Sequence, residues 1–339
     1  MINLISDTIT KPTPEMLQAM MQAEVGDDVF GEDPSINKLE AKAAALFGKE
    51  AALFCPSGTM TNQIAITLHS GPLTEVIADE SSHVYNYEVG GISFNARASV
   101  KLLPGNRGRI SAKQIQGAIN PADVHKARSA LVCLENTSNR GGGSCYDWAE
   151  LEKIRALCRQ SNLKLHLDGA RLFNAVVKTH TPVEKFGSLF DTVSICLSKS
   201  LGAPVGSLLI GDKVTIDQAR RLRKVMGGGM RQAGFLAAAG LYALQHHVER
   251  LAEDHQLADE IANIMKNLSY VDGLLEPETN ILIFYLRENI NPQHFLAWLQ
   301  ENNIKAACIG GQAIRFVTHL DVNQNDLNPL AECLKGYAP

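Results

Sequence analysis

The chain has 339 residues, of which 45% are hydrophobic and 20% are charged, a composition typical of a globular protein with a sizeable core. The net charge of −4, with both signs spread along the chain, favours neither nucleic acid nor a membrane as partner. The seven cysteines form no C-x-x-C pair, and neither a signal peptide nor a long apolar span is recognisable. We therefore predict a soluble, cytoplasmic protein.

Short apolar runs alternate with helical patterns through the first two thirds of the chain. We predict strands over 73–78, 98–103, 129–134, 163–168, 192–197 and 206–210, and helices over 14–24, 35–48, 59–69, 111–119 and 147–160. This alternation predicts a three-layer α/β fold with a mainly parallel sheet and right-handed crossovers. The loop before the last strand is too short for a crossover, so we expect that strand to run antiparallel.

The last third of the chain has a different pattern of predicted helices and strands. An alanine-rich stretch predicts one long helix over 233–268. Beyond it we predict strands over 281–286 and 314–319, and helices over 293–301 and 324–335. The chain thus divides into a large domain, 1–245, whose N-terminal segment lies partly at a subunit interface, and a small C-terminal α/β domain, 246–339.

Two charged residues close neighbouring strands of the predicted sheet. Lys199 follows the strand 192–197, and Asp168 ends the strand 163–168. Each has a simpler interpretation, a surface lysine in a turn and a turn aspartate paired with Arg171. Ligands of open α/β sheets bind at the carboxyl ends of the strands, however, and a lysine there can form a Schiff base. Together the two residues predict pyridoxal phosphate (PLP), whose pyridine nitrogen a carboxylate keeps protonated.

Two further segments fit a PLP site. Gly58 and Thr59 open a predicted helix, where backbone N–H groups bind phosphate, although an ordinary helix cap is the commoner role. His83 follows a strand and suits either ring stacking and proton transfer or a structural role. Tyr87 lies four residues further on and lines the same pocket if the segment is helical.

Three consecutive glycines lie between basic residues in RLRKVMGGGMRQAG. The simpler interpretation is a flexible, solvated basic loop. The alternative is a phosphate contact by Lys224 and Arg231, reaching the site of a neighbouring subunit.

Taken together, these segments resemble the low-specificity L-threonine aldolases, PLP-dependent enzymes of the aspartate aminotransferase fold type (PLP fold type I). The resemblance extends from the N-terminus to about Asp321. The segments that carry it are ISDTITKP, VGDDVFGEDP, GKEAALFCPSGTMTN, SSHVYNYEVGG, LENT, LHLDGARLFNAV, ICLSKSLGAPVGSLL, RKVMGGGMRQAG and IRFVTHLD. Two local departures concern the pocket for the β-substituent: Ser138 replaces a common histidine, and Tyr87 stands where phenylalanine is also found.

The resemblance implies a role for each matching residue. Lys199 is the Schiff-base lysine, Asp168 the partner of the pyridine nitrogen, and His83 the residue stacked on the ring. The other roles implied are phosphate binding by Gly58, Thr59 and Ser198, contacts across a subunit interface by Lys224 and Arg231, and substrate binding by Ser6, Arg171, Arg315 and Tyr87, with Arg171 also near the cofactor. His125 matches a second active-site histidine, so His83 and His125 are both candidates for the base.

The implied reaction cleaves L-threonine or L-allo-threonine to glycine and acetaldehyde, with tolerance for other β-hydroxy-α-amino acids. The implied assembly is a homotetramer built from dimers with shared active sites. Hydroxyls of Thr8 and Thr10 make a weak case for a cation. The alternatives are another PLP enzyme (a β-eliminating lyase, racemase or aminotransferase), a non-catalytic PLP-binding protein, and a nucleotide-binding domain, which the absence of G-x-G-x-x-G disfavours.

Overall fold

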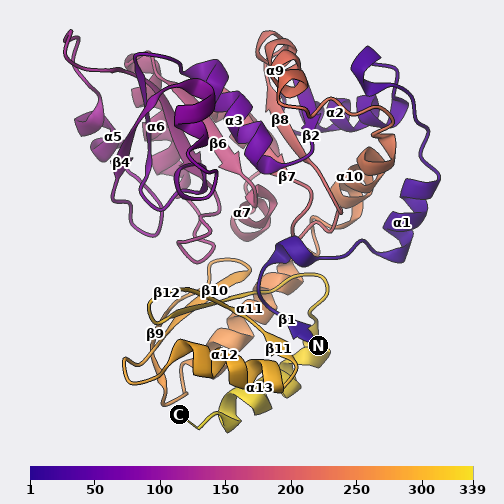
Figure 1. Cartoon of the computed structure of the whole chain (residues 1–339), viewed down its shortest axis with the longest axis vertical. Coiled ribbons are helices and arrows are strands. Elements are labelled where there is room, and N and C mark those ends of the chain that lie inside the picture. The colour runs from indigo at the N-terminus through magenta and orange to yellow at the C-terminus, as the bar shows by residue number, and fades with distance from the viewer. Residues whose placement is uncertain (339) are drawn as a thin grey trace.

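A seven-stranded sheet forms the centre of the large domain in the computed structural model, which describes residues 1–338 (Figure 1). Its strands are β2 (Ala51–Cys55), β3 (Thr74–Asp79), β4 (Ser99–Leu103), β5 (Arg128–Glu135), β6 (Lys164–Gly169), β7 (Thr192–Cys196) and β8 (Ser207–Gly211). Their order is β2-β8-β7-β6-β5-β3-β4, and only β8 runs antiparallel to its neighbours. The predicted fold class, with its single antiparallel strand, is confirmed; β2 was not predicted.

Helices cover both faces of this sheet. They are α1 (Pro14–Met21), α2 (Pro34–Leu46), α3 (Gly58–His69), α4 (His83–Asn86), α5 (Ala112–Ala118), α6 (Trp148–Gln160), α7 (Leu172–Thr179), α8 (Val183–Leu189), α9 (Lys213–Val225) and α10 (Gly234–His246). Successive strand residues point to opposite layers. Leu53 and Leu209 pack with α3 and α9, whereas Phe54 and Leu208 belong to the core that includes α2 and α10. No helix within residues 1–338 is long and apolar enough to cross a membrane.

The predicted single helix over 233–268 is wrong, because the chain breaks it after α10. His247 is buried, and its Nδ1 lies 2.7 Å from the carbonyl oxygen of Leu201. This tertiary bond anchors the chain where a straight helix would have continued. A second helix, α11 (Leu251–Met265), then enters the small domain, with Arg250 paired to Asp254 in its first turn.

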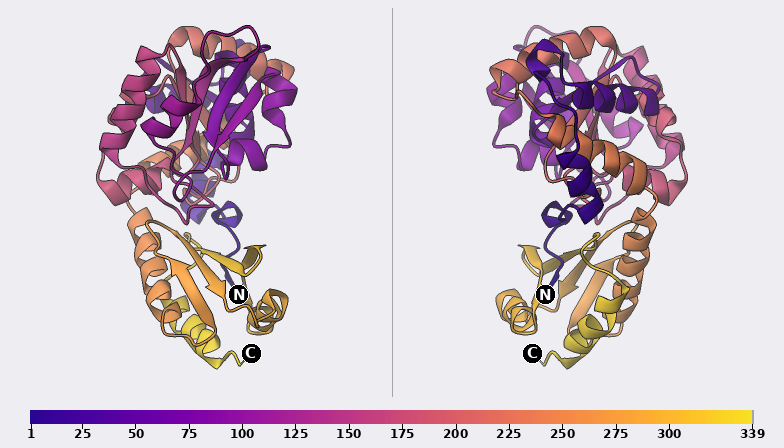
Figure 2. Two further views of the ribbon diagram at one scale, coloured as in Figure 1. Left: turned by 90° about the vertical axis from the view of Figure 1, so that its left-hand side faces the viewer. Right: turned by 90° about the vertical axis from the view of Figure 1, so that its right-hand side faces the viewer.

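The small domain has its own core. Strands β9 (Val271–Leu275), β10 (Ile281–Leu286), β12 (Ala307–Gly310) and β13 (Ala313–Val317) form an antiparallel sheet in the order β12-β13-β10-β9, and its helices are α11, α12 (Pro292–Glu301) and α13 (Leu327–Gly336). Leu282, Phe284 and Phe316 bury one face of this sheet. Figure 2 shows the small domain below the large one, with the N-terminus beside it.

The first residues differ from the predicted domain division. β1 (Ile2–Asn3) pairs with β11 (Ile304–Lys305), and Ile2 and Leu4 are buried in the core of the small domain. Their assignment to the large domain is therefore wrong: a two-residue strand has too little pattern to be recognised, and its partner is distant in the sequence. The chain then crosses to the large domain (Figure 1).

A loop between β5 and α6 fastens the two domains together. Glu278 of the small domain accepts a hydrogen bond from the Cys145 N–H at 2.8 Å and pairs with Arg107 at 2.9 Å. The Thr279 hydroxyl donates to the Gly143 carbonyl at 2.8 Å. These bonds hold the loop, and the residues on it, at the junction of the two domains.

The packing of α8 on the end of α2 generates a stability prediction. A Cβ at Gly187 would lie 1.8 Å from the Phe47 carbonyl oxygen, whereas a Cβ at Gly117 of α5 would have no atom within 4 Å. We expect Gly187→Ala to lower the free energy of unfolding by about 1–3 kcal/mol through overpacking. Gly117→Ala is the matched control and should raise it by about 0.5–1 kcal/mol. Thermal and urea unfolding of both variants would measure this, and equal stabilities would contradict it.

Candidate active site

Three charged residues meet at the carboxyl ends of β5, β6 and β7. Asp168 lies in register with Glu135 on one side and with Ser194 on the other. Lys199 follows β7 after a short turn, and both Asp168 and Lys199 line the same cavity. The structure thus brings together the two residues that the sequence analysis placed at one sheet edge.

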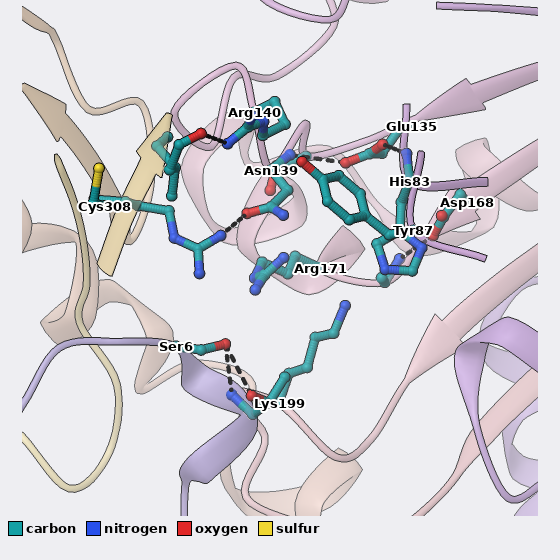
Figure 3. A pocket seen from close by; sticks show the side chains of 15 residues that line it. Ser6, His83, Tyr87, Glu135, Asn139, Arg140, Asp168, Arg171, Lys199 and Cys308 are labelled. Atoms are coloured by element: carbon teal, nitrogen blue, oxygen red, sulfur yellow. Dashed lines mark hydrogen bonds between the residues drawn. The ribbon is translucent and has the colours of Figure 1, made fainter. Parts of the chain in front are cut away.

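Two adjoining cavities open at this edge. The larger has a volume of about 500 Å³ and extends toward β12 of the small domain; the smaller has a volume of about 260 Å³ and extends toward the start of α3. Both are lined by Thr8, His83, Asp168, Ala170 and Lys199. Figure 3 shows the larger cavity, with Lys199 pointing into it. A site of this shape accommodates a cofactor in one part and a substrate in the other.

The start of α3 lines the smaller cavity and suits a phosphate group. The Ser57 hydroxyl accepts a hydrogen bond from the Met60 N–H at 3.2 Å, while the N–H groups of Gly58 and Thr59 belong to the unpaired first turn of a twelve-residue helix. A Cβ at Gly58 would lie 2.6 Å from the Cys196 sulfur, so the close approach of α3 to β7 requires glycine there. Ser198 lines the same cavity.

Asp168 and Lys199 fit the other functional groups of PLP. Asp168 is 2% exposed, and its carboxylate accepts hydrogen bonds from the Asn62 amide at 2.9 Å and from the Ala170 N–H at 3.1 Å. An ionised carboxylate held in this way is a partner for a protonated pyridine nitrogen. The Lys199 amine makes no hydrogen bond to any of residues 1–338, which leaves it available to a carbonyl carbon.

A buried amide connects Asp168 to a second carboxylate. Asn62 Nδ2 donates to Asp168 and also to Glu88, at 3.0 Å, while Asn62 Oδ1 lies 3.1 Å from His166 Nε2. Burial lowers the pKa of His166 to about 4, so this imidazole is neutral. Because the Asp168 and Glu88 carboxylates accept the Asn62 N–H groups, Asn62 Oδ1 faces His166 Nε2, which therefore carries the proton; Nδ1 lies 2.8 Å from the Thr192 hydroxyl. The orientation of the Asn62 amide is fixed in this way.

His83 is held by the same network. Its Nδ1 lies 3.0 Å from Glu88 Oε1, and its backbone N–H donates to Glu135 at 2.8 Å. Burial lowers the pKa of His83, but the hydrogen bond to Glu88 and the charges of Asp168 and Glu88 outweigh it, so the pKa lies above the usual value. Glu88 keeps a proton on Nδ1, and Nε2 is the nitrogen that exchanges protons with a ligand.

Arg171 has a buried partner. Its Nε and Nη2 donate to the Asp7 carboxylate at 2.7 and 2.6 Å, and the Ser200 hydroxyl donates to the same group at 2.9 Å. Burial raises the pKa of Asp7, but Arg171 outweighs this and holds the pKa far below its usual range. The simpler interpretation of a pair between Arg171 and Asp168 is therefore wrong. Only Nη1 of Arg171 remains for a ligand.

Arg315 offers a more accessible anchor for a carboxylate. Its Nη1 donates to Asn139 at 2.7 Å and its Nη2 to the Ile5 carbonyl at 2.9 Å, whereas the buried Nε has no partner within residues 1–338. Ser6 lines the same cavity and accepts hydrogen bonds from the N–H and hydroxyl of Thr8 at 3.3 and 2.9 Å (Figure 3). Arg315, Ser6 and the free nitrogen of Arg171 together suit a substrate carboxylate.

The structure does not bring His125 into this cavity. Its side chain is 87% exposed, and it pairs with Asp123 at 2.9 Å. His125 is therefore not brought beside His83 within one chain, and its role as a second active-site histidine stays a prediction. Lys224 and Arg231 are also exposed outside the cavity, and Arg231 pairs with Asp27 at 2.9 Å.

At the possible cation site near Thr8 and Thr10, both hydroxyls form hydrogen bonds within the chain. Thr8 donates to Ser6, while Thr10 donates to the Asp7 carbonyl at 2.7 Å and lies 3.0 Å from His319 Nδ1. Both hydroxyl oxygens keep lone pairs, but hydroxyls alone are a weak ligand set for a cation. We therefore build no function on a cation there.

The sequence predicted no role for several residues of the site. Asn62, Glu135, Asn139 and Arg140 line the two cavities, and Glu88 is hydrogen-bonded to Asn62 and lies 3.0 Å from His83 Nδ1. Glu88 and Glu135 lie inside segments that the analysis had singled out, SSHVYNYEVGG and LENT. Both segments mix polar and apolar residues, so nothing local in them marks either carboxylate as buried.

The fold and the site define a PLP-dependent enzyme. The chain matches the Beta-eliminating lyase family over residues 3–289. It is 40% identical over 340 residues to the low specificity L-threonine aldolase of Escherichia coli K12, covering 99% of both chains. It is also 38% identical over 343 residues to low-specificity L-threonine aldolase 1 of Arabidopsis thaliana, covering 98% of this chain and 95% of the relative. The chain therefore belongs to the beta-eliminating lyase family, and within it to the low-specificity L-threonine aldolases.

Solved structures agree on the fold. The threonine aldolase of Leishmania major superposes with a TM-score of 0.85 at 24% identity, covering 99% of both chains. The serine palmitoyltransferase of Sphingomonas wittichii superposes with a TM-score of 0.76 at 16% identity, covering 98% of this chain and 86% of the other. The mainly parallel sheet with a small C-terminal domain is thus the PLP fold type I.

The unbonded amine of Lys199 generates a binding prediction. We expect Lys199→Ala to lose the visible absorption band of covalently held PLP, because no other lysine lines either cavity. Lys213→Ala, which removes an exposed lysine paired with Asp217, is the matched control and should keep the band. Spectra after dialysis against PLP-free buffer would decide between these outcomes. A band retained in Lys199→Ala would remove the central assignment of the site.

Proposed function

We propose that this protein cleaves L-threonine and L-allo-threonine to glycine and acetaldehyde, and that it accepts other β-hydroxy-α-amino acids. One observation carries the proposal: the unbonded amine of Lys199, the hydrogen-bonded carboxylate of Asp168 and the partnered His83 line one cavity. The family supports the reaction, since its members from Escherichia coli and Arabidopsis thaliana are named as threonine aldolases. The enzyme is thus a carbon–carbon lyase.

The residues of the chain prepare the cofactor. Bound PLP supplies the electron sink for the pair released when the Cα–Cβ bond breaks. Lys199 would hold the cofactor through its amine, which no other group of residues 1–338 engages. Asp168 accepts the pyridine N–H and, with Asn62 fixing its carboxylate, stabilises the positive charge of the ring. Gly58 and Thr59 bind the phosphate at the start of α3.

The substrate carboxylate sets the geometry of bond breaking. Arg315, Ser6 and Nη1 of Arg171 grip this group on one side of the cavity. A carboxylate held by guanidinium groups cannot rotate freely, so the remaining two bonds at Cα take defined positions. By fixing the carboxylate, these residues would decide which of the remaining bonds at Cα is aligned for cleavage with the electron sink that PLP would supply.

His83 is the base that this chain supplies. In a retro-aldol cleavage the β-hydroxyl loses its proton, the aldehyde leaves, and Cα regains a proton to give glycine. His83 Nε2 accepts the hydroxyl proton, directly or through one water, while Glu88 steadies the proton on Nδ1. A base near neutrality is suited to this transfer, and the exposed position of His125 leaves His83 as the choice within one chain.

Other reactions on the same scaffold are less well supported. β-Elimination, racemisation and transamination also begin from an amino acid bound to PLP, and the protein selects among them by geometry. The aldolases with which this chain shares its full length favour carbon–carbon cleavage. A keto acid that retains the β-hydroxyl would instead indicate an aminotransferase.

The assembly is proposed as a cytoplasmic homotetramer built from dimers, in which Lys224 and Arg231 reach the site of a neighbouring subunit. Large apolar side chains on the surface support an interface there: Phe30 and Val225 are 72% and 80% exposed, and the Arg231 guanidinium lies 5.8 Å from the Phe30 ring. All seven cysteines are free, which suits a reducing compartment. Light scattering that gives the mass of a single chain would overturn the assembly.

Product analysis tests the reaction. Purified protein loaded with PLP should release equal amounts of glycine and acetaldehyde from L-threonine or L-allo-threonine, and Asp168→Ala should retain little turnover because the ring loses its counter-charge. Glycine and acetaldehyde are measured separately, by amine analysis and by coupled reduction of the aldehyde. Release of 2-oxobutanoate in place of glycine would replace cleavage with β-elimination. A protein that binds PLP but converts neither substrate would contradict the proposed function.

The pairing of His83 with Glu88 predicts the pH dependence. The base must be neutral to accept a proton, so activity rises with pH through the pKa of His83, which Glu88 holds above its usual value. Glu88→Gln should lower that pKa and move the acidic limb of kcat/KM to lower pH. Glu80→Gln, which neutralises an exposed carboxylate nearby in the chain, is the control. An acidic limb that stays in place in Glu88→Gln would exclude the pairing as its cause.

A further inference from the structure

We propose that the same site cleaves β-hydroxy-α-amino acids whose β-substituent ends in a carboxylate, with Arg140 binding that second carboxylate. The inference rests on the proposed function and extends it to a class of substrate. Arg140 lines the larger cavity and has no acidic partner within residues 1–338. Its one hydrogen bond inside the chain joins Nη1 to the Ile309 carbonyl at 2.6 Å.

The other charges of the cavity are already committed. Arg171 is neutralised by Asp7, and Arg315 is the anchor for the substrate α-carboxylate. Asp168 serves the pyridine nitrogen. The two oxygens of Glu135 accept the backbone N–H groups of His83 and Asn139, both at 2.8 Å. Arg140 is therefore a cation in the cavity that a threonine molecule leaves unpaired.

The position of Arg140 matches the β-substituent. In Figure 3 Arg140 and Tyr87 lie on the side of the cavity away from Lys199, whose amine marks where the substrate amine arrives. The Arg140 guanidinium is 5.9 Å from the Tyr87 ring, and that ring is 5.6 Å from the His83 imidazole. A substituent that projects from the carbon beside His83 thus runs along Tyr87 toward Arg140.

Arg140 is also held in place before any ligand arrives. The neighbouring Asn139 is bonded through its backbone to Glu135 and through its side chain to Arg315. Arg107 donates to the Gly141 carbonyl at 2.8 Å and so fixes the other side. The cation–π contact with Tyr87 and the hydrogen bond to the Ile309 carbonyl limit the rotamers of Arg140 itself. A guanidinium fork prepared in this way pairs with a carboxylate at little entropic cost.

The chemistry balances without a further reactant. In β-hydroxyaspartate the Cα–Cβ bond breaks, the hydroxyl oxygen loses its proton to His83 and forms the aldehyde, and Cα gains one proton. The products are glycine and glyoxylate, with no change in overall oxidation level. Arg140 pairs with the carboxylate throughout, so it binds the substrate and the anionic aldehyde before release.

The test compares two substrates in two variants. We expect the PLP-loaded enzyme to release glyoxylate from L-threo- or L-erythro-β-hydroxyaspartate. Arg140→Met should lower kcat/KM for β-hydroxyaspartate by about 10-fold to 100-fold, the effect of one charged hydrogen-bonded pair. For threonine, kcat/KM should stay within about threefold, since the methyl group makes no such pair. Arg159→Met, which removes an exposed arginine of α6, should change neither value.

The outcomes separate the inference from the function on which it rests. Threonine cleavage without any glyoxylate from β-hydroxyaspartate would overturn the inference and leave the proposed function intact. Loss of both activities in Arg140→Met, with the PLP band and melting temperature retained, would make Arg140 a ligand of the α-carboxylate and overturn the inference as well. Failure of the wild-type enzyme on both substrates would remove the proposed function itself.

Discussion

A single carboxamide holds the two buried carboxylates on which the rest of the site depends. Asn62 donates one amide N–H to Asp168 and the other to Glu88, and neutral His166 prevents the amide from turning over. Two ionised carboxylates in a dry environment repel each other and lose hydration. The amide compensates both without adding charge, so that each carboxylate stays available to a cationic partner, the pyridine nitrogen for Asp168 and His83 for Glu88.

His83 and Asp168 belong to one hydrogen-bonded network, which runs through Glu88 and Asn62. Glu88 and Asp168 both raise the pKa of His83, and both are anchored to the same side chain on α3. The same helix begins at Gly58, which we propose as a binder of the cofactor phosphate. Under the proposed function, one helix therefore positions the phosphate, the ring charge and, through Glu88, the base. Its packing across the sheet sets the geometry of all three.

The elements that the sequence predicts correctly are those with local signals. The strands that end at Asp168 and near Lys199 are apolar runs, and the charge that closes each run marks the sheet edge. Asn62 and Glu88 carry no such signal, because their partners are distant in the sequence. Asn62 is separated from Asp168 by 106 positions and from Glu88 by 26 positions. The helix break at His247 depends on the distant Leu201 in the same way. Residues whose role is set by long-range partners are therefore the ones that pattern alone misses.

Three arginines line the same cavity, and their different hydrogen-bond partners determine which of them is available to a ligand. Arg171 forms a buried salt bridge with Asp7, and Arg315 is hydrogen-bonded to the neutral side chain of Asn139. Arg140 has no acidic partner within residues 1–338 and bonds only to the Ile309 carbonyl. Asp7 and the Ile5 carbonyl, which orient the first two, lie on the segment that begins in the core of the small domain at Leu4. The carboxylate anchor is thus complete only when that segment crosses to the large domain. Under the proposed function, the arginines that bind the substrate are therefore oriented by the segment that connects the two domains.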